Sequence, residues 1–152
     1  MKVIIRRMRF SDVEEVSTLE KEIFSNPWSK YSIMQNLFHS DVCFSFVAEV
    51  DKKIAGYAFT WIVRDELHIG NIAVKKEMRR KKIAESLMKK IIEKGRIYGC
   101  SYAYLEVRKS NEAAISLYKK FGFVKNGVRK RYYPDNNEDA IIMFKYYKNK
   151  KK

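Results

Sequence analysis

Residues 54–63 form a run of ten uncharged residues in which both alternating sets of side chains are largely apolar. Because successive side chains of a strand point to opposite faces, this pattern predicts a strand that is buried on both sides. A helix that crosses a bilayer needs about 20 apolar residues, so this run is too short to be a membrane span. The sequence therefore predicts a sheet with this segment as a central strand.

The remaining segments change between a period of two, typical of strands, and the helical period of 3.6. They predict the order β-α-α-β-β-β-α-β-α-β-β, which is a mixed sheet with helices packed on it. We expect strands over residues 3–8, 42–50, 54–63, 67–74, 102–108, 123–128 and 140–146. We expect helices after the capping-box pattern of Ser11 and Glu14, after Ser29, over residues 82–98, and after Ser110 or Asn111.

The charge of the chain is unevenly distributed. There are 32 Lys and Arg residues against 18 Asp and Glu residues, and segments 75–82, 125–131 and 145–152 carry the whole net charge of +14. Such an excess is typical of proteins that bind polyanions, such as nucleic acid, an anionic membrane or a phosphorylated ligand. We interpret residues 1–146 as a single domain and residues 147–152 as a lysine-rich tail.

The cysteine and histidine content excludes two classes of small protein. Cys43 and Cys100 alone cannot form a disulfide framework, and two distant histidines predict no metal site. The first residues contain too short an apolar stretch for a signal peptide. We therefore expect a soluble, cytoplasmic protein that does not enter a membrane.

Basic side chains cluster at the predicted junction between the strand 67–74 and the helix 82–98. Residues 75–82 contain six Lys or Arg residues and one acid, Glu77. A helix N-terminus presents unpaired backbone N–H groups and a positive dipole end, so this junction could seat a pyrophosphate. The alternative is a basic surface loop before an ordinary helix, and charge alone slightly favours that alternative.

Two further side chains are candidates for proton transfer. Strand alternation places Glu106 on the same face as Tyr102, Tyr104 and Arg108, where it is a candidate general base or simply the ion-pair partner of Arg108. Tyr118 fits the apolar face of the helix after Asn111, which favours core packing. A tyrosine can also protonate a leaving group if its hydroxyl reaches a cleft.

The segment 129–139 contains an aromatic pair, a proline and an acidic pair between the last two predicted strands. It is either a structural hairpin or one wall of a substrate cleft, since long connections between strands often bind ligands.

Taken in order, these features resemble the GNAT superfamily of acetyl-CoA-dependent N-acetyltransferases over nearly the whole chain. The closer resemblance is to the RimI-like branch, which acetylates the N-terminal alanine of a ribosomal protein, and archaeal N-terminal acetyltransferases share much of the pattern. The residues that carry it are Pro27-Trp28-Ser29, Asn71-Ile72-Ala73-Val74, Leu105-Glu106-Val107-Arg108, Ser110-Asn111, Ala114-Ile115, Leu117-Tyr118, Gly122-Phe123, Arg131-Tyr132-Tyr133-Pro134 and Glu138-Asp139-Ala140-Ile141-Ile142-Met143.

The resemblance implies a fold and a set of site residues. The fold is an α/β (mixed α+β) sheet of about seven mostly antiparallel strands, with a splay between the fourth and fifth strands and four flanking helices. Glu106 would be the general base, and Tyr118 would protonate the departing thiolate of CoA. Trp28, Tyr132 and Tyr133 would bind the substrate. The acetyl-CoA-binding residues would be Ile72, Ala73, Val74, Arg79, Arg80, Lys81, Lys82, Ile83, Ala84, Glu85 and Asn111.

The sequence departs from the family pattern at Lys82, which stands where the phosphate-binding loop has its first glycine. We expect Lys82 to take a helical φ and to keep its amide available for phosphate.

Three functions are consistent with these residues. The first is acetylation of a protein N-terminus, such as that of a ribosomal protein, by direct attack in a ternary complex. The second keeps acetyl-CoA but acts on a small-molecule amine or a lysine side chain. The third is a non-catalytic basic module that docks on RNA or the ribosome, and a weak attraction to RNA is also compatible with the first.

Overall fold

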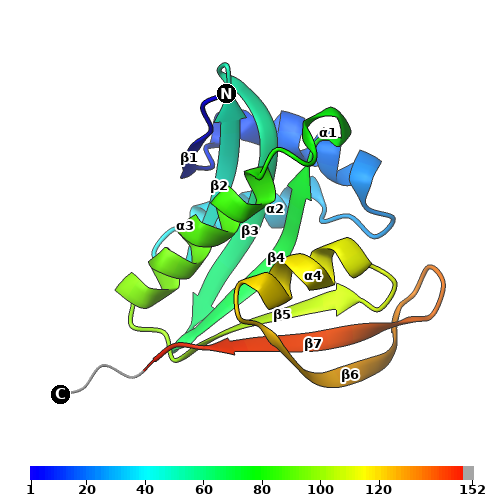
Figure 1. Ribbon diagram of the computed structural model, residues 1–152. Helices are drawn as coiled ribbons and strands as arrows, with labels where there is room; N and C mark the ends of the chain where they lie inside the picture. The colour runs from blue at the N-terminus through cyan, green and yellow to red at the C-terminus, as the bar shows by residue number, and fades with distance from the viewer. Residues whose placement is uncertain (149–152) are drawn as a thin grey trace. The chain divides into compact units, whose positions relative to one another are not determined.

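A computed structural model of the protein describes residues 1–148, and Figure 1 shows its ribbon. The helices and strands follow one another in the predicted order. The strands are β1 (Ile4–Arg7), β2 (Cys43–Val50), β3 (Lys53–Val63), β4 (Glu66–Val74), β5 (Tyr102–Arg108), β6 (Val124–Tyr133) and β7 (Glu138–Tyr146). The helices are α1 (Val13–Ile23), α2 (Lys30–Phe38), α3 (Ile83–Ile97) and α4 (Glu112–Lys120), with 3₁₀ turns at Phe10–Asp12 and Lys76–Met78.

The chain divides into two compact units. The first contains residues 1–61 and 70–91, and the second contains residues 62–69 and the chain from residue 92 onward. Strand β4 and helix α3 each contribute residues to both units. The single domain expected over residues 1–146 stays a prediction.

The first unit is an antiparallel sheet with helices on both faces. Strand β2 pairs with β1 and with β3, with a bulge at Ala48 and Glu49. Helices α1 and α2 lie on one face and α3 on the other (Figure 1). The buried cluster under α1 and α2 includes Val16, Ile33 and Phe59. Strand β3 lies between β2 and β4, which confirms the central strand predicted from residues 54–63.

The second unit is built around β5. Strand β5 pairs in parallel with β4, from Glu66–Tyr102 to Ile69–Leu105, and antiparallel with β7. Strand β6 pairs with β7 and is the edge strand. The strand order of the sheet is β1-β2-β3-β4-β5-β7-β6, which confirms the expected mixed, mostly antiparallel sheet. The register between β4 and β5 ends at Ile69–Leu105, although the two strands continue to Val74 and Arg108.

Two local predictions were wrong. Ser11 does not cap α1, because it lies within the 3₁₀ turn, and Asp12 instead accepts a hydrogen bond of 2.7 Å from the backbone N–H of Arg9. The last two strands are longer than predicted, so Tyr132 and Tyr133 lie in β6, and Glu138 and Asp139 lie in β7. Pairing between Tyr133 and Glu138 extends the ladder through a register shift that the sequence pattern does not reveal.

Tyr147, directly after β7, is held by two hydrogen bonds. Tyr147, the first residue of the predicted tail, donates hydrogen bonds of 2.9 Å from its backbone N–H to Ser101 and from its hydroxyl to Ile92. Residues 149–152 of the predicted tail lie outside the described residues. Within residues 1–148, no helix has the length and apolar character that crossing a membrane requires.

Candidate active site

The residues expected to form the site are distributed over both units. The first unit carries Trp28, residues 72–74 and the basic loop with the start of α3, residues 79–85. The second unit carries Glu106, Asn111, Tyr118, Tyr132 and Tyr133.

The loop between β4 and α3 is tied to its own strand. The Lys75 backbone N–H donates to the Ala55 carbonyl at 2.8 Å, and the Arg79 Nε donates to the Val74 carbonyl at 3.2 Å. The side chains of residues 79–82 are otherwise exposed. Since α3 begins at Ile83, its first backbone N–H groups open toward this loop, as a pyrophosphate site requires.

Lys82 does not have the helical φ that we expected. Its φ is +61°, and that of Arg80 is +63°, so both residues occupy the left-handed region that favours glycine. The chain therefore keeps the backbone conformation of a glycine at this position, at a steric cost of about 1–2 kcal/mol for a residue with a Cβ. The Lys82 carbonyl accepts bonds from the backbone N–H and the hydroxyl of Ser86, both at 3.1 Å, which fixes the start of α3.

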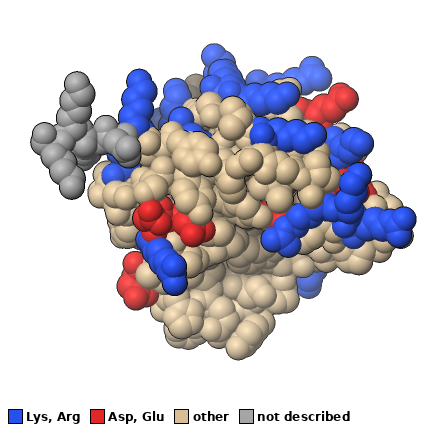
Figure 2. Space-filling model, turned by 90° about the horizontal axis from the view of Figure 1, so that it is seen from below, with Lys and Arg blue, Asp and Glu red and all other residues tan. Residues whose placement is uncertain are grey.

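The charge of this loop belongs to a broader pattern. Figure 2 shows one face of the molecule, on which Lys and Arg side chains cover a much larger area than Asp and Glu. Lys75 is partly neutralised by Glu15, at 3.3 Å. The exposed cations of residues 79–82 are thus available to an anionic ligand at the start of α3.

Trp28 lies against aromatic side chains of β3. Its ring stacks on Phe59, with centroids 4.4 Å apart, and lies 5.7 Å from Trp61. A Cβ at Gly70 would come within 3.0 Å of the Trp28 ring and 3.2 Å of the Trp61 ring, so glycine makes room for the two indoles. These contacts hold the segment between α1 and α2, which was expected to bind substrate.

A buried acid that sequence reasoning missed anchors the same segment. Glu20 of α1 is fully buried and accepts hydrogen bonds from the Trp28 backbone N–H (2.8 Å), the Tyr57 hydroxyl (2.8 Å) and the Asn71 side-chain amide (2.6 Å). Burial raises the pKa of Glu20, and the three donors partly offset that rise. The detectable signal was its spacing, since Glu20 stands four residues after the buried Val16 on the apolar face of α1.

In the second unit, Glu106 is paired with Arg129. The Arg129 Nε lies 2.6 Å from the Glu106 Oε2, and the Tyr132 hydroxyl donates to Oε1 at 3.3 Å. The Glu106 Oε2 is buried and, among the described residues, has no aligned hydrogen-bond donor, so its contact with Arg129 is an ion pair only. This oxygen therefore still has the capacity to accept a hydrogen bond.

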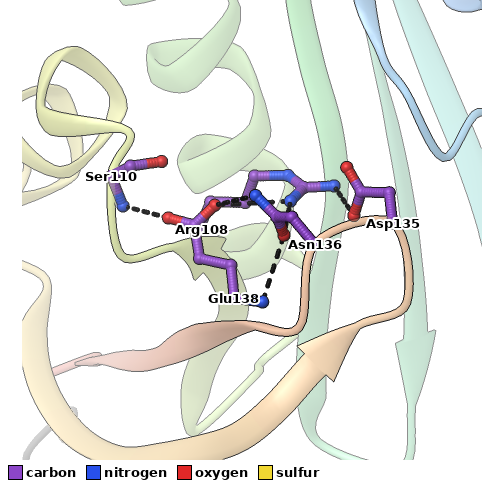
Figure 3. A network of polar contacts seen from close by, with 5 residues as sticks. All are labelled: Arg108, Ser110, Asp135, Asn136 and Glu138. Carbon is purple, nitrogen blue, oxygen red and sulfur yellow. Dashed lines mark hydrogen bonds and ion pairs between the residues drawn. The ribbon is translucent and has the colours of Figure 1, made fainter.

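Arg108 binds the turn between β6 and β7, as Figure 3 shows. Its guanidinium contacts Asp135 at 2.9 Å, Asn136 at 3.2 Å and Glu138 at 3.4 Å. The same guanidinium lies 4.0 Å above the Tyr133 ring.

We expected Arg108 as the alternative ion-pair partner of Glu106, whereas the cation beside Glu106 is Arg129. Arg108 instead positions the hairpin that carries Tyr132 and Tyr133.

Helix α4 presents the other two candidates. Asn111 is its N-cap, and its Oδ1 accepts a bond of 3.2 Å from the Ala114 backbone N–H, while its side-chain amide can still donate. Tyr118 is buried, 5.9 Å from the Phe123 ring between centroids. Burial, with a smaller effect of Tyr133, raises the pKa of Tyr118, so its hydroxyl stays protonated at neutral pH. Core packing and proton donation are both compatible with this position.

Comparisons with known proteins agree on one family. A model described as the acetyltransferase (GNAT) family matches residues 13–123. A Bacillus subtilis candidate ribosomal protein bS18-alanine N-acetyltransferase is 41% identical over 143 residues, covering 94% of this chain and 95% of that protein. The Escherichia coli (strain K12) ribosomal protein bS18-alanine N-acetyltransferase is 33% identical over 141 residues, 91% of this chain and 94% of that protein.

A solved structure extends the likeness to three dimensions. The crystal structure of the ribosomal-protein-S18-alanine N-acetyltransferase from Escherichia coli has a TM-score of 0.90 and 30% identity to this chain. The match covers 99% of this chain and 97% of the other. The likeness therefore extends over nearly the whole of both chains.

The buried carboxyl of Glu20 leads to a prediction about pH. Its pKa is higher in the folded protein than its ordinary value of 4.5, so its contribution to the free energy of unfolding is present below about pH 4.5 and is lost as the pH rises through the raised pKa. Glu20→Gln keeps the shape but does not titrate. Urea unfolding between pH 4 and pH 8 should show the wild type losing stability relative to Glu20→Gln as the pH rises.

The matched control for this experiment is Glu22→Gln, because Glu22 is an exposed acid of the same helix. The difference in unfolding free energy between wild type and Glu22→Gln should stay constant over the same range. A constant difference for Glu20→Gln as well would contradict the raised pKa.

The left-handed backbone of Lys82 predicts an unusual response to glycine. Lys82→Gly should stabilise the folded protein by about 1–2 kcal/mol, because it removes the steric cost of a Cβ at a positive φ. It should also destabilise the folded protein by about 0.5–1 kcal/mol, because glycine gives the unfolded chain more conformational freedom. The free energy of unfolding should therefore rise by up to about 1.5 kcal/mol. Lys81→Gly is the control, since Lys81 does not have a positive φ, and it should lower stability by about 0.5–1 kcal/mol. Equal effects of the two variants would show that Lys82 is unstrained.

Proposed function

The chain belongs to the acetyltransferase (GNAT) family, and we propose that it transfers the acetyl group of acetyl-CoA to the α-amine of a protein N-terminus. The proposed substrate class rests on the similarity of this chain to enzymes named for acetylating the alanine of ribosomal protein bS18. That similarity extends over more than 90% of both chains. The N-terminus of a ribosomal protein is thus the proposed acceptor, and a cytoplasmic location would suit it.

We assign cofactor binding to the first unit and to Asn111. The edge of residues 72–74 offers backbone groups to the amides of the pantetheine arm. Residues 79–85 offer the N–H groups at the start of α3 and four cationic side chains to the pyrophosphate. The positive φ of Lys82 supports this fit, because it reproduces a glycine-like backbone at the expected position. Acetyl-CoA supplies the activated acetyl group.

The proposed chemistry needs three proton transfers. Glu106, acting directly or through water, takes a proton from the substrate ammonium, because only a neutral amine can attack the thioester carbonyl. The amine nitrogen bonds to that carbon, the carbon–sulfur bond breaks, and the Tyr118 hydroxyl gives its proton to the departing thiolate. The second proton, which the nitrogen loses as it becomes an amide, returns to Tyr118 through solvent. The raised pKa of Tyr118 means that its hydroxyl carries a proton at neutral pH.

Trp28, Tyr132 and Tyr133 are the proposed substrate contacts. The segment of Trp28 is held by Glu20, and the hairpin of Tyr132 and Tyr133 is held by Arg108. Rigid aromatic side chains bind a peptide at a low entropy cost. The basic segments add a weaker, sequence-independent attraction to anionic partners such as ribosomal RNA, which we propose as a secondary property.

The acceptor class can be tested by measuring thiol release from acetyl-CoA. A panel of short peptides that differ at the first residue is compared with free polyamines and with peptides whose N-terminus is blocked but that contain lysine. We expect turnover with the free N-termini only. Turnover with polyamines or with the blocked lysine peptides would replace the proposed acceptor with the corresponding one.

The roles of Glu106 and Tyr118 predict different kinetic losses. Glu106→Gln should lower kcat by about 10²–10⁴-fold, most strongly at low pH, where more of the substrate amine is protonated. Tyr118→Phe should lower kcat with little change in the KM for peptide. Glu93→Gln, an exposed acid on α3, is the control and should match the wild type. A pH–rate profile of Glu106→Gln that parallels the wild type would contradict the assignment of the base.

A further inference from the structure

One face of the second unit carries a continuous layer of aromatic side chains. Cross-strand pairing arranges this face in rows that run across β4, β5 and β7. The rows are Glu66–Tyr102–Tyr146, His68–Tyr104–Phe144 and Glu106–Ile142. We call His68, Tyr102, Tyr104, Phe144 and Tyr146 the aromatic face.

The rings of the aromatic face contact one another and remain accessible. Neighbouring ring centroids lie between 5.1 and 6.1 Å apart. Helix α4 packs on the opposite side of β5 and β7, as Figure 1 shows, and the residues between the rings, such as Leu105 and Met143, are buried there. Tyr146 is 63% exposed, and the other four members are partly exposed. A cluster of accessible rings of this kind is a candidate interaction surface.

The charge at one end of the aromatic face is negative. Glu66 contacts His68 at 3.2 Å, and Asp65 accepts a bond of 2.5 Å from the Ser101 hydroxyl. Within residues 1–148, neither carboxylate has a lysine or arginine partner, although the net charge of the chain is +14. Burial, followed by Glu66 and Asp65, raises the pKa of Tyr102, in agreement with a negative potential there.

Two cations of the neighbouring strands, Arg129 and Lys145, do not reverse this sign. Arg129 is neutralised by Glu106 at the other end of the face. Lys145 of β7 points to the opposite side, since its Nζ lies 3.0 Å from where a Cβ of Gly122 would stand. Carboxylates repel the phosphates of a nucleic acid. They attract lysine and arginine side chains, which aromatic rings also bind through cation–π contacts.

The aromatic face leads away from the proposed base. Glu106 and Tyr102 are four residues apart on β5, a separation of roughly 13 Å at the rise of a strand. An extended peptide whose first residue lies at Glu106 can reach the Tyr102 row with its fourth or fifth residue. From these observations, we propose that the aromatic face, with Glu66 and Asp65, binds lysine and arginine side chains located about three to seven residues after the acetylated N-terminus of the protein substrate.

This inference rests on the proposed function and refines its substrate class to N-termini followed by a basic stretch. The kinetic test uses two octapeptides with the same first three residues, one with lysine at positions four to seven and one with serine there. A tripeptide amide with the same three residues is too short to reach the Tyr102 row and the carboxylates beside it. We expect the wild type to show at least a tenfold lower KM for the lysine octapeptide than for the serine octapeptide, with equal kcat.

Two variants remove parts of the surface with little risk to folding. Glu66→Gln preserves shape, and Tyr146 is largely exposed, so Tyr146→Ala removes an accessible ring. Each should raise the KM for the lysine octapeptide three- to tenfold and leave the KM for the serine octapeptide unchanged. Glu93→Gln makes the same charge change on α3 and should affect neither KM. Equal KM values for the two octapeptides in the wild type, or variant losses that are the same for both, would overturn the inference.

A binding measurement separates this inference from the proposed function. Calorimetry is performed with Nα-acetylated lysine and serine octapeptides and with a single-stranded RNA octamer, so no turnover is needed. Salt-sensitive binding of the lysine peptide that weakens in Glu66→Gln supports the inference even if no peptide is acetylated. RNA binding that Tyr146→Ala weakens, without binding of the lysine peptide, would assign the face to nucleic acid and refute it. Acetylation of the tripeptide without any preference for lysine would leave the proposed function standing alone.

Discussion

The two-residue repeat of β5 determines how chemistry is arranged in the second unit. Ala103, Leu105 and Val107 are buried on one face, which forces Tyr102, Tyr104, Glu106 and Arg108 onto the other. Burial of the three apolar side chains under α4 stabilises this register by roughly 25 cal/mol per Å² of apolar surface removed from water. A slip of one residue would bury the acid and the arginine, so the packing of the core also specifies the candidate base.

Polar anchors then position the segments that carry the proposed substrate contacts. Glu20 holds the segment of Trp28 with a fully buried carboxylate, and Arg108 holds the hairpin of Tyr132 and Tyr133 with a partly buried guanidinium. The two anchors offset the cost of desolvation differently. The buried acid is compensated by its three hydrogen bonds, whereas the guanidinium is compensated by the carboxylates of Asp135 and Glu138. Both leave the aromatic side chains in fixed orientations.

Electrostatics divide the molecule by function. The basic loop before α3 suits a phosphate-bearing donor, because its cations stand beside unpaired helix amides. The carboxylates Asp65 and Glu66 create a local region of opposite sign on a chain with a net charge of +14. A high net charge is therefore a poor guide to the partner of any single surface. The local arrangement of acids and rings is the better guide to what binds there.

The sequence by itself determined the order of the elements, the faces of the strands and one helix cap, Ser29, and it narrowed the cap of α4 to Ser110 or Asn111. These features depend on neighbours within a few residues, so periodicity and side-chain type are sufficient to predict them. The resemblance in the motifs also indicated the family that the comparisons confirm.

Only the tertiary structure decided which partners surround each charged group. The contact of Glu106 with Arg129, the burial of Glu20 beneath Trp28 and the aromatic face all join residues that are distant in the chain. Local pattern also failed at Lys82, where the expected helical φ was replaced by a left-handed one. The surrounding loop and the start of α3 impose that conformation, because the free energy of the whole turn outweighs the preference of one residue.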